Sequence, residues 1–236
     1  MRLLITRPEQ DAGALAAALS EHGHSARLEP LIAIVPVPEA VVPGKSYQAV
    51  LVTSANGVRA LAGSAGFERL QGTPVLAVGR ASAEASRQAG FAQVEDASGD
   101  LNDLVRLAGE HCSASAGPLL YAAGKVISGD LKAMLEAEGY EVDRVVLYDA
   151  VPAERLSSGA LSALRSGEID GVLHFSPRTA RVWARLAPND ARDLVHFCLS
   201  QAVADALLEE LDEPAGSIRV AERPNQDALM ALIDRA

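Results

Sequence analysis

Four short turns in the chain combine residue types that can bind an anion. Each is expected to follow a buried strand and to begin a helix, where backbone N–H groups and the positive end of the helix dipole favour a negatively charged ligand. Serine is also a common helix N-cap, so capping alone would account for any single turn. As a set, the turns favour a polyanionic small molecule. They are Thr53-Ser54-Ala55-Asn56-Gly57, Gly79-Arg80-Ala81-Ser82, Ser176-Pro177-Arg178-Thr179 and Ser200-Gln201.

Other familiar sites of chemistry are missing from the sequence. The first predicted strand is followed by Thr6-Arg7-Pro8 instead of a glycine-rich dinucleotide loop, and no P-loop for phosphate occurs. The histidines have no metal-ligand spacing beyond the His22-x-His24 pair, which we expect to be solvated. His174 and His196 are expected to be core or strand-end residues. We therefore expect neither a cofactor nor a metal ion.

The turns lie between elements that alternate in type. Most predicted strands are followed by helical periodicity, as where Ala12, Leu15 and Leu19 form one stripe that stops at Gly23. This alternation is typical of a doubly wound parallel sheet, which binds ligands at the carboxyl ends of its strands. The predicted strands are Arg2 to Ile5, Ser25 to Leu28, Ala49 to Thr53, Val75 to Val78, Gln93 to Glu95, Pro118 to Tyr121, Glu141 to Tyr148, Gly171 to Phe175, Val195 to Leu199 and Ser217 to Val220.

The chain repeats itself in an order that indicates two similar domains. Residues 3–36 align without a gap on residues 119–152, and residues 49–61 resemble residues 171–183. A weaker pair of copies begins at Val75 and Val195. We therefore predict an α/β protein with two similar doubly wound parallel-sheet domains joined by a two-stranded extended linker.

Two extended stretches next to prolines, near residues 33–38 and 148–152, predict the linkers, because proline blocks helix and favours extended backbone before it. One domain would then be continuous, residues 38–150, and the other discontinuous, residues 1–35 plus 153–236. The alternative is one continuous sheet for each half of the sequence.

Composition excludes several classes of protein. With 236 residues, of which 49% are apolar and 22% charged, the chain can bury a large core, so disorder is excluded. A net charge of −10 with thinly spread basic residues argues against nucleic-acid binding. No apolar run approaches the length of a membrane span, and the first residues lack a signal peptide. Cys112 and Cys198 fit a reduced compartment. We expect a soluble cytoplasmic monomer.

Five short motifs occur along the chain: LLITRP at residues 3–8, VTSANGV at 52–58, VGRASA at 78–83, Leu147-Tyr148 before the linker, and FSP at 175–177. In this order they resemble uroporphyrinogen-III synthase. Each is short, but together they cover almost the whole sequence. The resemblance implies two α/β domains, no cofactor and no metal. It also implies that the linear tetrapyrrole hydroxymethylbilane is closed to uroporphyrinogen III with inversion of ring D and loss of water, a step of tetrapyrrole biosynthesis.

The resemblance also implies roles for individual residues. Tyr148 is the candidate proton donor for the departing hydroxyl of ring A, and Ser82 is the candidate to orient that hydroxyl. The chain departs from the family where Ser200 replaces a usual glycine and Val203 a frequent threonine, so a hydroxyl role at position 203 is lost. It also lacks an arginine before Gly124.

The substrate would be a polycarboxylate, which a protein of net charge −10 cannot attract by its overall field. Local donors must therefore bind it. An alternative from another class is a non-catalytic two-domain module that binds a small polyanion. The expected substrate-binding residues are Arg7, Ser54, Asn56, Gly57, Gly79, Gly124, Lys125, Ser176, Arg178 and Ser200.

Overall fold

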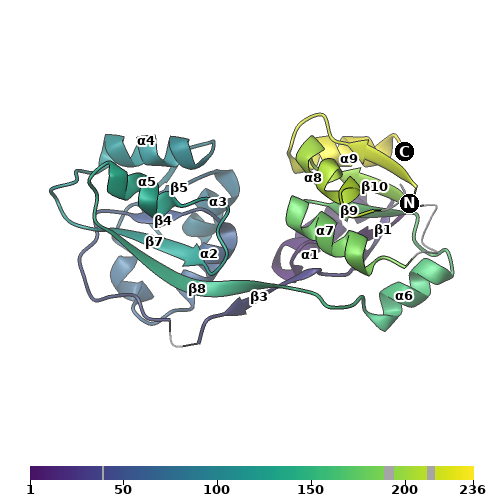
Figure 1. The fold of residues 1–236 in the computed structure, drawn as a ribbon, viewed down its shortest axis with the longest axis horizontal. Coiled ribbons are helices and arrows are strands. Elements are labelled where there is room, and N and C mark those ends of the chain that lie inside the picture. Colours follow the sequence, from purple (N-terminus) through teal and green to yellow (C-terminus); the bar gives the residue numbers. More distant parts are fainter. Residues whose placement is uncertain (39, 189–193, 212–215) are drawn as a thin grey trace. The chain divides into compact units, whose positions relative to one another are not determined.

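The computed structural model describes residues 1–38, 40–188, 194–211 and 216–236. In it the chain divides into two compact units. Unit 1 contains Met1–Ala33 and Val151–Ala236, and unit 2 contains Ile34–Ala150. Each unit has its own sheet with helices on both faces (Figure 1). The predicted α/β class with two parallel-sheet domains is confirmed.

The sheet of unit 1 has the order β11-β10-β9-β1-β2, and its neighbouring strands are parallel. In its register Leu4 lies opposite Val172, which lies opposite His196. The helices α1 and α9 cover one face, and α6, α7 and α8 cover the other. The elements are β1 (Arg2–Ile5), α1 (Glu9–Glu21), β2 (Ser25–Leu28), α6 (Ser158–Arg165), β9 (Gly171–His174), α7 (Pro177–Leu186), β10 (Val195–Cys198), α8 (Gln201–Leu208), β11 (Ser217–Val220) and α9 (Gln226–Asp234).

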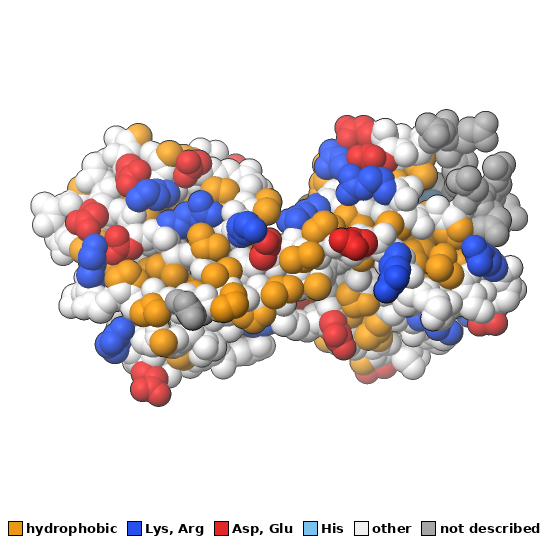
Figure 2. Space-filling model, turned by 60° about the horizontal axis from the view of Figure 1, so that its bottom comes forward, with side chains coloured by type: hydrophobic (Ala, Val, Ile, Leu, Met, Phe, Trp, Pro, Cys, Tyr) orange, Lys and Arg blue, Asp and Glu red, His pale blue; other side chains and the backbone are white. Residues whose placement is uncertain are grey.

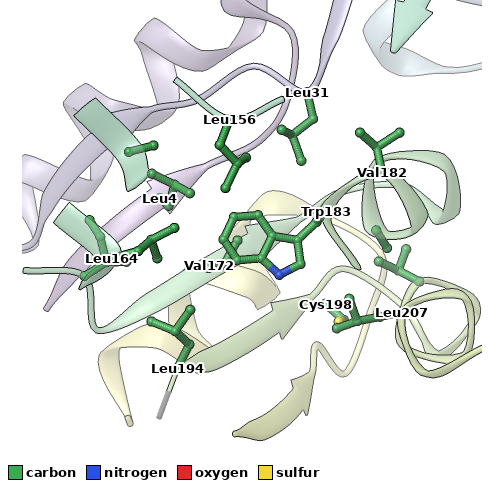
Figure 3. Packing of buried hydrophobic residues seen from close by; sticks show 14 of the residues in the cluster. Leu4, Leu31, Leu156, Leu164, Val172, Val182, Trp183, Leu194, Cys198 and Leu207 are labelled. Atoms are coloured by element: carbon green, nitrogen blue, oxygen red, sulfur yellow. The ribbon is translucent and has the colours of Figure 1, made fainter. Parts of the chain in front are cut away.

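Trp183 of α7 lies at the centre of the larger core of unit 1 (Figure 3). It is 1% exposed and packs among side chains from the sheet and from the covering helices, including Leu4, Leu164 and Val172. Because it is the chain's only tryptophan, its fluorescence reports on the packing of this unit.

The sheet of unit 2 has the order β3-β8-β7-β4-β5-β6. The helices α2 and α3 pack on one face, and α4 and α5 pack on the other. A 3-10 turn, Phe67–Leu70, precedes β5. The elements are β3 (Ile32–Pro36), β4 (Val50–Val52), α2 (Ala55–Ala62), β5 (Val75–Ala77), α3 (Arg80–Gln88), β6 (Val94–Asp96), α4 (Leu101–His111), β7 (Leu119–Gly124), α5 (Leu131–Ala137) and β8 (Val142–Pro152).

The strand orders show how the sequence repeat is used. The copies β1 and β2 correspond to β7 and β8, and β4, β5 and β6 correspond to β9, β10 and β11. The sheet of unit 1 places the first copy of one repeat, β2-β1, beside the second copy of the other, β9-β10-β11. The sheet of unit 2 places the second copy of the former, β8-β7, beside the first copy of the latter, β4-β5-β6. Each unit is therefore assembled from both halves of the repeat.

The two extended stretches with prolines lie side by side as β3 and the end of β8. The N–H of Val37 donates to the carbonyl of Leu147, and the N–H of Ala153 donates to the carbonyl of Leu31, each at 2.9 Å. These bonds show that the two segments run in opposite directions. The stretch that we expected near residues 148–152 is the continuation of an eleven-residue strand.

Candidate active site

Two of the four turns are helix N-caps whose side chains are engaged. The Ser54 Oγ accepts hydrogen bonds from the N–H of Asn56 at 3.0 Å and of Gly57 at 3.4 Å. The Ser176 Oγ accepts from the N–H of Thr179 at 3.2 Å and lies 2.6 Å from the Thr179 Oγ1. These N–H groups have partners within the chain, so both turns present fewer backbone donors than the sequence suggested.

The other two turns begin their helices without a side-chain cap. Gly79 precedes α3 with φ −167° and ψ 173°, and Ser200 precedes α8 with φ −155° and ψ 167°. This backbone is extended and open to any residue, which explains why serine can replace the family's glycine at position 200. With no capping side chain, the first N–H groups of α3 and α8 keep their attraction for an anion.

An irregularity in β8 brings Tyr148 to Ser54. Ala123 pairs with Val146 but Gly124 pairs with Tyr148, so Leu147 is the extra residue of a bulge. Consecutive residues of a regular strand point to opposite faces, yet Leu147 and Tyr148 pack in the same apolar cluster. The bulge therefore aims Tyr148 at α2, where its Oη lies 3.2 Å from the Ser54 Oγ. Tyr148 is 8% exposed.

Two glycines make room for this arrangement. A Cβ at Gly124 would lie 2.7 Å from the Cζ of Tyr148, closer than real atoms approach. A Cβ at Gly57 would lie 3.0 Å from the carbonyl oxygen of Ala122 and 3.9 Å from the Tyr148 ring. The sequence pattern suggested these glycines as sources of backbone donors. In the structure, their lack of a side chain also leaves the space in which the tyrosine ring packs.

A second hydroxyl pair lies at the same end of the sheet and was missed by the sequence reasoning. The Thr53 Oγ1 is 3.2 Å from the Tyr121 Oη, and burial raises the pKa of Tyr121. Beside it the Arg144 Nη2 donates to the carbonyls of Gly124 at 2.9 Å and Lys125 at 3.2 Å. Alternation along β4 and β7 places Thr53 and Tyr121 on one face, a signal from which the pair was predictable.

The expected cationic residues are held by neighbours. The Arg7 guanidinium lies 4.7 Å from the centre of the Phe175 ring, which precedes the Ser176 turn. The Lys125 Nζ is 3.1 Å from a carboxylate oxygen of Asp149. Arg178 is the second residue of α7 and also has an interaction partner.

The structure thus sorts the predicted site residues into two groups. Ser82 is in unit 2 but is only 4% exposed in the first turn of α3. The strand before this helix, β5, is separated from β8, the strand of Tyr148, by β7 and β4. Unit 2 contains Ser54, Asn56, Gly57, Gly79, Ser82, Gly124, Lys125 and Tyr148, whereas unit 1 contains Arg7, Ser176, Arg178 and Ser200.

Within the described ranges no three His, Cys, Asp or Glu side chains gather to hold a metal ion. None of the described helices has the length and apolar character needed to cross a membrane. On the face in Figure 2 the Lys and Arg side chains are scattered among acidic and apolar ones instead of forming one basic patch.

Comparison with known proteins decides the family. The family model of uroporphyrinogen-III synthase HemD matches residues 13–231. The chain belongs to this family. The porphyrin biosynthesis protein HemD of Ruminiclostridium josui is 24% identical over 220 residues, which are 87% of this chain. The chain spans 43% of the length of that relative.

Two solved structures share the HemD fold seen here. Uroporphyrinogen-III synthetase from Helicobacter pylori superimposes with a TM-score of 0.68 at 18% identity, covering 99% of this chain and 98% of that one. A mutant uroporphyrinogen III synthase from Thermus thermophilus gives a TM-score of 0.56 at 20% identity, covering 100% of this chain and 96% of that one. At these identities the likeness concerns the fold.

Proposed function

We propose that this protein closes hydroxymethylbilane to uroporphyrinogen III, inverting ring D and releasing water. The observation that carries the proposal is the match of the HemD family to residues 13–231, nearly the full sequence. The arrangement of Tyr148 supports it, because a phenol hydroxyl beside a helix N-terminus suits proton donation to a leaving hydroxyl.

Tyr148 is proposed to give its proton to the terminal hydroxyl of ring A, which departs as water and leaves an azafulvene. The substituted carbon of ring D then attacks through a spiro intermediate. Folding the substrate so that this carbon is within reach is the larger task of the protein, since holding reacting groups in position lowers the barrier without new chemistry. Ser82 is proposed to orient the leaving hydroxyl.

Local groups are proposed to bind the acetate and propionate side chains of the substrate. The uncapped first turns of α3 and α8, after Gly79 and Ser200, offer N–H groups without adding net charge. Arg7, Lys125 and Arg178 add cationic partners, and Ser54, Asn56, Gly57, Gly124 and Ser176 complete the proposed set. No cofactor or metal takes part in the proposed reaction.

We further infer that the protein acts in the cytoplasm as a monomer. Cys112 and Cys198 are both free thiols, as expected in a reducing compartment. The proposed domains are residues 1–35 plus 153–236 and residues 38–150, with the linkers near 33–38 and 148–152.

The test is an isomer assay on the purified protein with freshly generated hydroxymethylbilane, in which the ratio of isomers I and III is measured after oxidation. The wild type is expected to give isomer III. Tyr148→Phe keeps the ring but loses the acid, so isomer III formation is expected to fall by about 10² to 10⁴-fold. The loss is expected near the lower figure, because the substrate also cyclises unaided to isomer I. Ser82→Ala is expected to lose less.

Tyr140→Phe is the matched control, because the Tyr140 hydroxyl donates to the carbonyl of Cys112 and not to the proposed site. It is expected to keep full activity. A wild-type protein that binds a tetrapyrrole without converting hydroxymethylbilane would instead favour the non-catalytic binding module. Full isomer III activity in Tyr148→Phe would remove Tyr148 from the mechanism.

A further inference from the structure

The bonds around Ser54 favour one direction for its hydrogen bond with Tyr148. A serine hydroxyl has one hydrogen and two acceptor lone pairs. The N–H of Asn56 donates to the Ser54 Oγ at 3.0 Å, and the N–H of Gly57, which also donates to the Ser54 carbonyl at 3.0 Å, reaches the Oγ at 3.4 Å. In the remaining contact, 3.2 Å to the Tyr148 Oη, either oxygen can be the donor, and the N–H groups already directed at the Ser54 lone pairs favour the serine. This arrangement favours Ser54 as the donor and Tyr148 as the acceptor.

With Ser54 as the donor, the hydrogen of Tyr148 is directed away from Ser54. A phenol has a single O–H, which conjugation keeps near the ring plane. The ring itself packs closely against Gly124, which limits its orientation. We propose that Ser54 is a positioning residue that holds the Tyr148 hydroxyl as a hydrogen-bond donor toward the substrate. This role rests on the proposed proton donation by Tyr148.

The sequence repeat contains an internal comparison for this role. Ser176 is the counterpart of Ser54, and Thr179 is the counterpart of Gly57. The Ser176 hydroxyl lies 2.6 Å from the Thr179 Oγ1, so that cap is closed within its own helix. Glycine at position 57 offers no hydroxyl to Ser54, which leaves the Ser54 hydrogen for Tyr148. Of these two equivalent caps, the one at Ser54 therefore has a hydroxyl that contacts the candidate acid.

The same contact stabilises the charge that forms during the reaction. When Tyr148 gives its proton to the departing hydroxyl, the C–O bond breaks, water leaves and a phenolate remains. The bond from Ser54 then ends on an oxyanion and becomes charge-assisted, and the N-terminus of α2 adds its positive dipole. Overall loss of one water requires the substrate framework to release one proton, which restores the phenol.

The test is a double-mutant cycle between Ser54 and Tyr148 in the isomer assay. Ser54→Ala is expected to lower kcat for isomer III by about 10- to 100-fold, the range for a hydrogen bond to a charged group, with a smaller change in KM. Ser54→Thr keeps the hydroxyl and is expected to recover most of the activity. In the Tyr148→Phe background, Ser54→Ala is expected to cause no further loss, because its effect passes through the phenol.

Asp100→Ala is the control for lost capping. Asp100 caps α4 in the same unit by accepting from the N–H groups of Asn102 and Asp103, away from Tyr148. It is expected to lower the thermal midpoint as Ser54→Ala does while leaving kcat unchanged. Circular dichroism establishes that every variant is folded.

Three outcomes would overturn the positioning role. Losses that multiply in the double variant would show that Ser54 acts independently of Tyr148. Equal losses in Ser54→Ala and Ser54→Thr would show that the hydroxyl is not what matters. Full activity in Ser54→Ala beside an impaired Tyr148→Phe would show that the acid needs no positioning. By contrast, a wild-type protein that forms no isomer III would refute the proposed function itself.

Discussion

Glu29 and Ser157, 128 positions apart in the chain, are joined by two hydrogen bonds of 2.6 Å, one from the N–H and one from the hydroxyl of Ser157. Glu29 precedes β3 and is 6% exposed, and Ser157 follows β8 and caps α6 through the N–H of Ala160. The pair therefore links the segment by which the chain leaves unit 1, before β3, to the segment by which it returns, after β8.

We expect Glu29→Ala to lower the free energy of unfolding of unit 1 by about 2 kcal/mol, because two hydrogen bonds to a buried carboxylate are lost. Denaturant unfolding followed by Trp183 fluorescence measures this directly. Glu154→Ala, an exposed carboxylate close in sequence, is the control and is expected to have little effect. Equal shifts in the two variants would contradict the prediction.

Acid should weaken unit 1 through the buried pair of His174 and His196. Their Nε2 and Nδ1 atoms are 3.1 Å apart, and burial, with His196 as the second cause, holds the pKa of His174 well below its ordinary 6.5. The folded His174 stays neutral where the unfolded one takes a proton. Stability contributed by this group is present above pH 6.5 and falls below it, by about 1.4 kcal/mol per pH unit.

His174→Gln is expected to flatten this dependence between about pH 6.5 and 5, the range just below the unfolded pKa. The measurement is denaturant unfolding at several pH values with Trp183 as the probe, whose ring centre is 6.0 Å from that of His174. His111→Gln, at an exposed histidine, is expected to leave the slope unchanged. A slope that His174→Gln does not alter would place the acid sensitivity elsewhere.

The Tyr47 hydroxyl is expected to lose its proton at a higher pH than an ordinary tyrosine. Burial and the hydrogen bond that its hydroxyl donates to Asp143 raise its pKa to about 12, while Lys45 holds the pKa of Asp143 below its usual range. A raised pKa means that this stabilisation is complete below about pH 10, the ordinary tyrosine value, and is lost as the pH rises through 12.

Ultraviolet absorbance titration is expected to lose one late-ionising phenol in Tyr47→Phe. In Asp143→Asn the same phenol is expected to ionise earlier, because the acceptor no longer carries a negative charge. If the phenol lost in Tyr47→Phe is one that ionises near pH 10, the raised pKa is refuted.

Residues 34–150 should fold alone as a domain. Both apolar clusters of unit 2 are formed entirely by residues of this segment, one on each face of its sheet. The excised segment is expected to unfold cooperatively in denaturant. A segment that stops at Pro118 lacks β7, the strand between β4 and β8, and is expected to remain unfolded. A gradual transition in the longer segment would refute its independence.

The sequence predicted the strands better than the site. Each of the ten predicted strands has a counterpart in the structure, because runs of Val and Leu between helical stripes are a local signal. The approach of Tyr148 to Ser54 depends on a bulge, which is a shift of register between two strands and leaves no local pattern. The space that Gly124 leaves for the tyrosine ring cannot be predicted from the sequence for the same reason, because it too depends on the pairing of two strands.

One expectation was wrong for a similar reason. His24 was expected to be solvated, yet its side chain is 11% exposed, with its Nε2 3.0 Å from Asp234 and its Nδ1 3.0 Å from the amino group of Met1. Asp234 lies at the end of α9. A partner 210 positions away cannot be read from the neighbours of a histidine in the sequence.

The exchange of repeat halves between the units dictates an order of completion on the ribosome. Leu3 of β1 must wait for Gly171 of β9, which is synthesised 168 residues later. At about 5 to 20 residues per second this delay is roughly 10 to 30 s, long enough for all of residues 34–150 to emerge and fold first. During that time the apolar side chains of β1 have no partner on one side. Residues 1–33 are therefore expected to wait longer for their folding partners than residues 34–150 do.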